Sequence, residues 1–338
     1  MSADRKLAEG SDAIKQAEKC LKTGFLKWKP DFDNAASEYC RAATCFKSAK
    51  ALEQCKDAHL KATDCYLKAG SFFSAGKQCE QAALVSRDMG DLKQTSSLVD
   101  RASRFFIDSR SPDTAALVLE RGAKIIEAKF PEIAVEFFTR ASEIVGVEDR
   151  PRQAADFRSQ AVRILLKLKK WDEAAEAISA QQQLLLEGED QKSAARLAVG
   201  LILVQLARDD PVAASRVFKN SSAYMESEEQ CTLSELLDGY DEGDPDAIVR
   251  ALNRPFVKHM DTEFAKLARI LQQQQMAAAA KQEEETSRRK KTESVAVPQV
   301  EAGEGEGANI PPEDEEKGEE TVGAVHESED DEYAGGLL

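Results

Sequence analysis

The stretch ASEYCRAATCF, residues 36–46, decides the fold because its spacing returns along most of the chain. The small residues Ala36, Ala42 and Ala43 alternate in it with the large residues Tyr39 and Phe46. Offsets of 3, 7 and 10 residues from Ala36 keep these side chains on one face of a helix. The small side chains let a neighbouring helix approach closely, and the large ones fill the remaining space.

The same pattern begins again about every twenty residues. Its anchors are Ala36, Lys56, Gly76, Ser96, Ala116, Val135, Ala154 and Ala175, with weaker copies from Ala195 and Ala214. A pitch of about 20 residues holds a helix of about 14 and a short turn, so two units make a helical hairpin of about 40. One unit cannot bury its own face, and we therefore expect a solenoid from about residue 13 to 220. An ordinary helical bundle is the alternative, which ten in-phase copies disfavour.

Helix-start signals agree with this phase. Ser111, Asp210 and Asp244 each precede a proline, which predicts a capping side chain before a proline in the first helical turn. Pro131 and Pro151 also open units. No alternating stretch rich in β-formers competes with the helical pattern.

Beyond residue 225 the rhythm changes. Glu228–Tyr240 predicts an amphipathic helix whose apolar face includes Cys231 and Leu233. Ala247–Leu252 and Glu263–Leu271 predict two more helices, and the run 272–291 is expected to extend the last one.

The acidity of the chain is confined to its tail. The net charge is -15, but residues 301–338 carry fourteen acidic residues and one lysine, a net of -13, which leaves about -2 for residues 1–300. A segment of this composition cannot form a core. We predict an all-α protein: a TPR-like right-handed superhelical solenoid of antiparallel helix pairs (1–225), a C-terminal helical bundle (226–291) and a disordered acidic tail (292–338).

The sequence offers little chemistry. It has no signal-peptide pattern and no apolar run of eighteen residues, and its seven cysteines lack paired short spacing, which together predict a cytosolic protein. Phosphate-loop, dinucleotide and zinc-protease motifs are missing. His59 falls in a large-residue column of the repeat and is expected in the core. We therefore predict a binding protein that is not an enzyme and uses neither cofactor nor metal, with no nucleic acid among its partners.

Three stretches are candidates for binding. Phe25, Leu26 and Trp28 alternate with Lys27 and Lys29 in a loop between Gly24 and Pro30, a pattern that fits shallow insertion into an anionic membrane surface. The alternative is a hydrophobic plug that packs on the next helix. Basic residues also recur on the helical units, where one basic face could meet an acidic partner: Arg121, Lys124, Arg140, Arg158, Arg163 and Lys167. An acidic cluster, Asp238, Asp241 and Glu242, ends the 228–242 helix against the macrodipole, which suggests partner binding.

Three blocks together resemble the soluble NSF attachment proteins, in particular the gamma type: LKTGFLKWKPDFDNAASEYCRAATCFKSAK (21–50), CTLSELLDGYDEGD (231–244) and DEYAGG (331–336). The resemblance implies an adaptor in vesicle transport that binds the four-helix SNARE bundle (syntaxin-type) and recruits the hexameric ATPase NSF, which takes the bundle apart.

Carried over by position, the resemblance assigns Phe25, Leu26 and Trp28 to membrane attachment. It assigns Asp238, Asp241 and Glu242 to contact with the ATPase, and Leu337 to its stimulation. Leu117 and Asp156 stand where the alpha type has lysines that face the SNARE bundle. A cytoplasmic protein peripherally associated with membranes is expected. The alternative function is a generic helical-repeat scaffold for trafficking or cytoskeletal partners.

Overall fold

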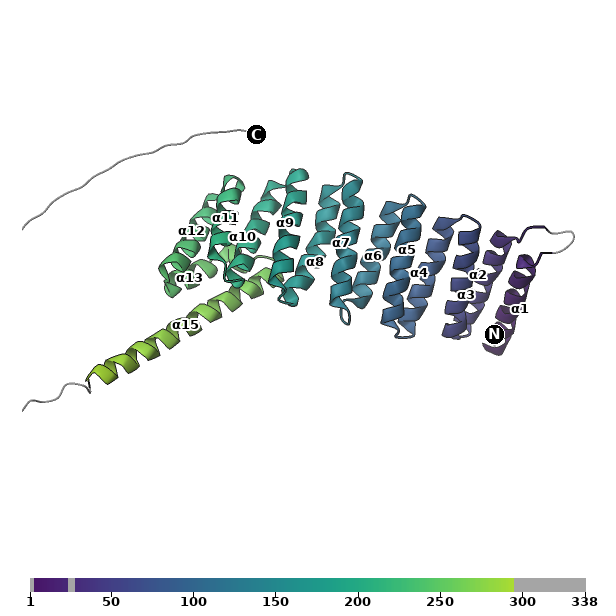
Figure 1. The fold of residues 1–338 in the computed structure, drawn as a ribbon, viewed down its shortest axis with the longest axis horizontal. Helices are drawn as coiled ribbons and strands as arrows, with labels where there is room; N and C mark the ends of the chain where they lie inside the picture. The colour runs from purple at the N-terminus through teal and green to yellow at the C-terminus, as the bar shows by residue number, and fades with distance from the viewer. Residues whose placement is uncertain (1–2, 24–27, 295–338) are drawn as a thin grey trace, which may run out of the picture. The chain divides into compact units, whose positions relative to one another are not determined.

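A computed structural model describes residues 3–23 and 28–294. All regular elements in these two ranges are helices (Figure 1). They are α1 (Ala3–Leu21), α2 (Phe32–Ser48), α3 (Leu52–Lys68), α4 (Phe72–Asp88), α5 (Leu92–Asp108), α6 (Pro112–Ile126), α7 (Pro131–Val147), α8 (Pro151–Lys167), α9 (Trp171–Glu187), α10 (Gln191–Ala207), α11 (Pro211–Ser221), the short 3-10 helix η1 (Ser222–Tyr224), α12 (Ser227–Glu242), α13 (Pro245–Leu252), α14 (Pro255–Lys258) and α15 (Thr262–Ser294). The chain divides into two units, Met1–Thr286 and Ser287–Leu338.

The predicted twenty-residue pitch is confirmed, although most of the repeat helices are longer than expected. Helices α2 to α5 and α7 to α10 have 17 residues, against the predicted 14 or so, and turns of three residues join most of them. In each such turn the middle residue adopts a left-handed conformation, as Lys50 and Gly90 do. In most of these turns the next N–H donates to the carbonyl five residues earlier, for example from Ala51 to Phe46 at 2.9 Å. This Schellman arrangement satisfies the last carbonyls of the helix and shortens the connection.

The role of this turn can be tested by comparing a glycine in one of the turns, Gly90, with a glycine inside a helix, Gly146. Gly90 has φ +82° and no heavy atom within 4 Å of a built Cβ, so an alanine there adds only backbone strain. Gly146 lies inside α7, and its built Cβ is 3.9 Å from that of Ala154. We expect Gly90→Ala to lower the free energy of unfolding by about 1 kcal/mol and Gly146→Ala to raise it by roughly 0.5 kcal/mol, measured by urea denaturation. Changes of the same sign at both sites would contradict this account of the turn.

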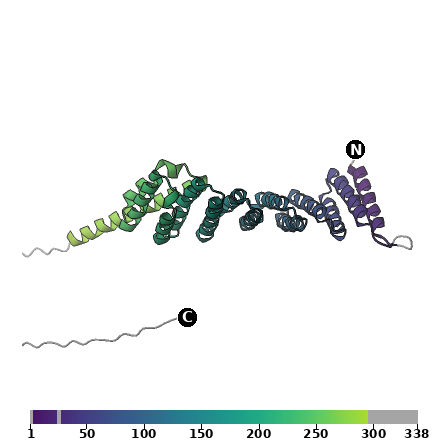
Figure 2. The same cartoon turned by 90° about the horizontal axis from the view of Figure 1, so that it is seen from above.

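Successive helices pack on each other in antiparallel pairs, and Figure 1 shows α2 to α10 side by side in chain order. Figure 2 views many of them end-on. The anchors of the repeat lie on the contact faces: all are buried except Val135, which is half-buried. At Gly122 a built Cβ would lie 2.4 Å from Val99 Cγ1, so α5 and α6 meet there without room for a side chain. The all-α, TPR-like fold class is confirmed.

The turns lie alternately at two edges of this stack, because consecutive helices run in opposite directions (Figure 1). We name the edge that carries the α1–α2 loop, the α3–α4 turn and the α5–α6 turn the first edge. The other, which carries the α2–α3 and α4–α5 turns, is the second edge.

Most of the predicted helix starts are observed. Prolines stand in the first turn of α6, α7, α8, α11 and α13, and the side chains of Asp210 and Asp244 accept hydrogen bonds from backbone N–H groups of the helices that follow. The predicted cap at Ser111 is wrong. Its hydroxyl instead donates to the carbonyl of Ser109 at 3.4 Å, so it makes no bond to its own helix.

The helices predicted beyond residue 225 are present as α12, α13 and α15, and α15 continues through the run 272–291 to Ser294. Cys231, predicted on the apolar face of α12, is exposed. It precedes the buried Leu233 by two residues, a rotation of about 200° around the helix axis, so the two side chains point in nearly opposite directions. The ring of Phe264 lies on the backbone of α10, 2.7 Å from where a Cβ would stand at Gly200. One apolar core therefore runs from α8 to α15. The division at residue 225 stays a prediction, and residues 295–338 lie outside the described ranges.

Candidate interaction surfaces

The loop between α1 and α2 presents a tryptophan to solvent. The N–H of Asp31 donates to the carbonyl of Cys20 at 3.0 Å, which ties the two ends of the loop together. Trp28 is 88% exposed and Lys29 is exposed as well. The plug alternative is therefore wrong for Trp28, whose ring covers no neighbouring helix. Phe25, Leu26 and Lys27 lie outside the described residues.

The six predicted basic residues do not form one face. Arg121 on α6 pairs with Glu80 on α4 at 2.9 Å, and Lys167 on α8 pairs with Glu127 at the end of α6, also at 2.9 Å. Arg140 on α7 instead pairs with Asp100 on α5. These ion pairs join each helix to the one two places earlier. Arg121 and Lys167 therefore lie on the side of the stack formed by α4, α6 and α8, whereas Arg140 lies on the side formed by α5 and α7.

The remaining members differ in accessibility. Lys124 pairs with Glu120 within α6, and both Lys124 and Arg163 are exposed at equivalent positions of α6 and α8. Arg158 is half-buried against α7, where it donates to the hydroxyl of Thr139 at 3.4 Å, and burial lowers its pKa. Its Nε finds no hydrogen-bond partner among the described residues. Arg158 therefore serves the contact between helices more than a partner.

Glu80 shows why Arg121 is also part of the structure. Burial raises the pKa of the Glu80 carboxyl, and the charge of Arg121 opposes that shift. Loss of Arg121 would leave a carboxylate in a poorly hydrated place, so the pair joins α4 to α6 as well as carrying charge.

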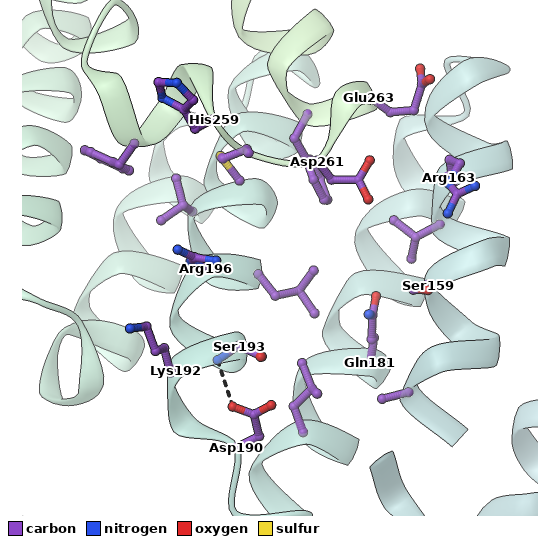
Figure 3. Close-up of a pocket in the computed structure, with 18 of the residues that line it drawn as sticks. Ser159, Arg163, Gln181, Asp190, Lys192, Ser193, Arg196, His259, Asp261 and Glu263 are labelled. Atoms are coloured by element: carbon purple, nitrogen blue, oxygen red, sulfur yellow. Dashed lines mark hydrogen bonds between the residues drawn. The ribbon is translucent and has the colours of Figure 1, made fainter. Parts of the chain in front are cut away.

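A cavity of about 700 Å³ lies between α8, α10 and the start of α15 (Figure 3). Its walls carry the cations Arg163 and Arg196 and the acids Asp261 and Glu263. The charges are mixed, so the cavity does not select a ligand of one sign. Sequence reasoning found Arg163 but missed the cavity, because α15 comes from a part of the chain without the repeat.

The acidic cluster on α12 is exposed as predicted. Asp238, Asp241 and Glu242 occupy its last turns, and Asp238 accepts a hydrogen bond from Ser234 at 3.3 Å. Gly243 ends the helix in a left-handed conformation, and Asp244 caps α13 directly after it. The three carboxylates are thus held on the last turns of one helix and are exposed to solvent. Leu337 lies outside the described residues.

His59 is buried as expected, its Nδ1 is 2.8 Å from Oε1 of Gln78, and burial lowers its pKa. No group of three or more His, Cys, Asp or Glu residues in residues 3–23 and 28–294 could hold a metal ion. Across the same ranges, no helix combines the length and the apolar character that a membrane crossing requires.

Comparison with known proteins places the chain in a family. The family model described as soluble NSF attachment protein matches residues 8–254, and the chain belongs to that family. A gamma-soluble NSF attachment protein of Dictyostelium discoideum is 26% identical over 274 residues, which cover 80% of this chain and 84% of that protein. One of Arabidopsis thaliana is 24% identical over 261 residues, 76% of this chain and 90% of that protein. The resemblance to the gamma type is confirmed.

Solved structures share the helical-repeat character only loosely. The apo form of RapI has a TM-score of 0.31 at 12% identity and covers 82% of this chain and 99% of its own. BtubC from P. vanneervenii has a TM-score of 0.30 at 10% identity, covering 62% and 93%.

Proposed function

We propose that the chain is an adaptor that binds a SNARE four-helix bundle, recruits the NSF ATPase to it and has no catalysis of its own. The observation that carries this proposal is the family match over residues 8–254. Its mechanism is electrostatic complementarity: exposed cations on α6 and α8 meet an acidic coiled coil, and the acidic end of α12 meets the ATPase. Several copies around one bundle would add avidity to weak single contacts.

We assign the gripping surface to Lys124, Arg163 and Lys167, the exposed cations of α6 and α8. Their surface ion pairs contribute little to stability, so the cations can exchange partners for the acids of a bundle. Arg121 is unsuitable for a test because its reversal would place two carboxylates together at Glu80.

Reversal of these three cations to glutamate should lower SNARE capture in a pull-down by at least about tenfold. The matched control reverses Lys50, Lys129 and Lys169, exposed lysines of the turns, and should leave capture nearly unchanged. Loss of capture in the control alone would move the gripping surface to these turns.

We further propose that the α1–α2 loop attaches the adaptor to anionic membranes, which makes it a cytoplasmic protein held peripherally at the bilayer. Phe25, Leu26 and Trp28 would enter the interface, with Lys27 and Lys29 beside the headgroups. The 88% exposure of Trp28 supports this role.

Trp28→Ser should therefore lower the affinity for phosphatidylserine vesicles by about tenfold, measured by flotation, because the indole would bury much of its area in the interface. The melting temperature should stay unchanged, since the ring touches no core. Val212→Ser, an exposed apolar site on the second edge, is the control. A fall in melting temperature without loss of vesicle binding would contradict the proposal.

A further inference from the structure

Large apolar side chains are exposed at several further points of the first edge. Phe72 and Phe73 open α4 directly after the α3–α4 turn, and Ile107 is near the end of α5 before the α5–α6 turn. Phe72 is 40% and Ile107 43% exposed. These turns lie at the same edge as the loop between α1 and α2, to which Trp28 belongs (Figure 1).

Lysines interleave with the aromatic rings along this edge. Lys68 Nζ stands 5.8 Å from the ring centroid of Phe32, the first residue of α2, which follows the Trp28 loop. Lys77 Nζ stands 4.6 Å from the ring centroid of Phe73, and that ring meets Phe106 edge-on at 5.4 Å between centroids. Phe32 and Phe73 are thus held at the starts of α2 and α4, each with a lysine over its ring, and Phe73 packs on the buried ring of Phe106 near the end of α5. Aromatic rings and lysines together are typical of side chains at a membrane–water interface.

Exposed cations lie along this part of the edge, together with the exposed acids Asp33, Asp108 and Asp113. Lys22, Lys29 and Arg110 are exposed in or beside its turns. Among the acids near them, Asp31 already accepts the hydrogen bond of the Asn34 N–H as the cap of α2.

A single loop is a weak anchor. Burial of a few side chains is worth only some kcal/mol, and stable attachment at a bilayer ordinarily needs more than one contact. The apolar groups stand at the ends of antiparallel helices, and the turns beside them lie at one edge of the stack (Figure 1).

We propose that the first edge from Trp28 through Phe72 and Phe73 to Ile107 is one continuous contact with an anionic lipid surface. Trp28 is then the first of three contacts. The inference rests on the proposed membrane attachment and extends it by two turns. It fixes the orientation of the adaptor, with the ends of helices α1 to α5 against the bilayer.

The test is depth-dependent fluorescence in the full chain. Trp28→Phe and Trp171→Phe remove the native tryptophans, and Phe72→Trp or Val212→Trp then places one reporter on the first or the second edge. Vesicles contain phosphatidylserine and brominated phosphatidylcholine. We expect a blue shift and quenching by brominated lipid for Phe72→Trp, and neither for Val212→Trp, which is 69% exposed.

A second measurement does not depend on the reporter. Phe72→Ser combined with Ile107→Ser should lower vesicle affinity by about tenfold relative to Val212→Ser. Quenching of native Trp28 in the Trp171→Phe protein without quenching of Phe72→Trp would overturn the edge and leave the loop in place. If brominated lipid quenches neither native Trp28 nor the Phe72→Trp reporter, the proposed membrane attachment itself is refuted. Loss of SNARE capture in the double variant, with full vesicle affinity, would reassign the edge to a protein partner.

Discussion

Replacement of Asp238, Asp241 and Glu242 by lysine is expected to weaken binding of the NSF ATPase to the adaptor–SNARE complex by about a hundredfold. The three carboxylates are exposed on the last turns of α12 and rigidly held by the α12–α13 junction. Under the proposed function they face a basic surface, and their reversal turns three attractions into three repulsions. Biolayer interferometry with immobilised SNARE complex measures the change.

The same substitutions separate binding from folding. Lysine at a helix C-terminus is favoured by the macrodipole, where an acid is not. The melting temperature should therefore stay level or rise slightly while ATPase binding is lost. The matched control reverses Glu132, Glu136 and Glu176, exposed acids of α7 and α9, and changes the net charge equally. If the control weakens ATPase binding as much as the α12 reversal, a general field effect explains the result and the site at α12 is refuted.

Phe106→Ala is expected to lower the free energy of unfolding by about 3–5 kcal/mol. Phe106 is among the largest fully buried side chains and fills the space that Gly76 leaves on α4, whose built Cβ would lie 3.0 Å from its ring. Phe73 packs edge-on against it. Urea denaturation followed by circular dichroism gives the value, with Leu117→Ala, half-exposed on α6, as a control expected to change stability by less than about 0.5 kcal/mol.

Because repeat helices contact mainly their neighbours, the damage should be local. Hydrogen exchange should accelerate first in α4, α5 and α6. Uniform acceleration from α1 to α13, or equal destabilisation by Leu117→Ala, would show that the repeat units do not pack as described.

The repeat could be predicted because its signal is local. Small and large residues at helical spacing, as in residues 36–46, identify the contact face of each helix without knowledge of its neighbour. The helix lengths could not be predicted as well. Lys50 and Glu189 take the left-handed conformation that ends a helix, although neither residue type marks such a turn.

The candidate surfaces were predictable only in part. Trp28 and Asp238 lie in non-repeating stretches whose composition sets them apart, and both are exposed, while their binding roles stay predictions. The grouping of the basic residues failed because ion pairs such as Asp100 with Arg140 join positions 40 residues apart. Whether such ion pairs form depends on how alternate helices stack, which cannot be predicted from a local sequence pattern.

The central claim is that the chain couples a SNARE bundle to an ATPase. Reconstituted disassembly tests it most directly: a fluorescently labelled SNARE complex, NSF and ATP are mixed with and without the protein, and the rate of complex loss is followed. The account predicts disassembly that depends on both NSF and this protein and that falls with the α12 charge reversal. A rate in its presence equal to that of NSF alone would contradict the account.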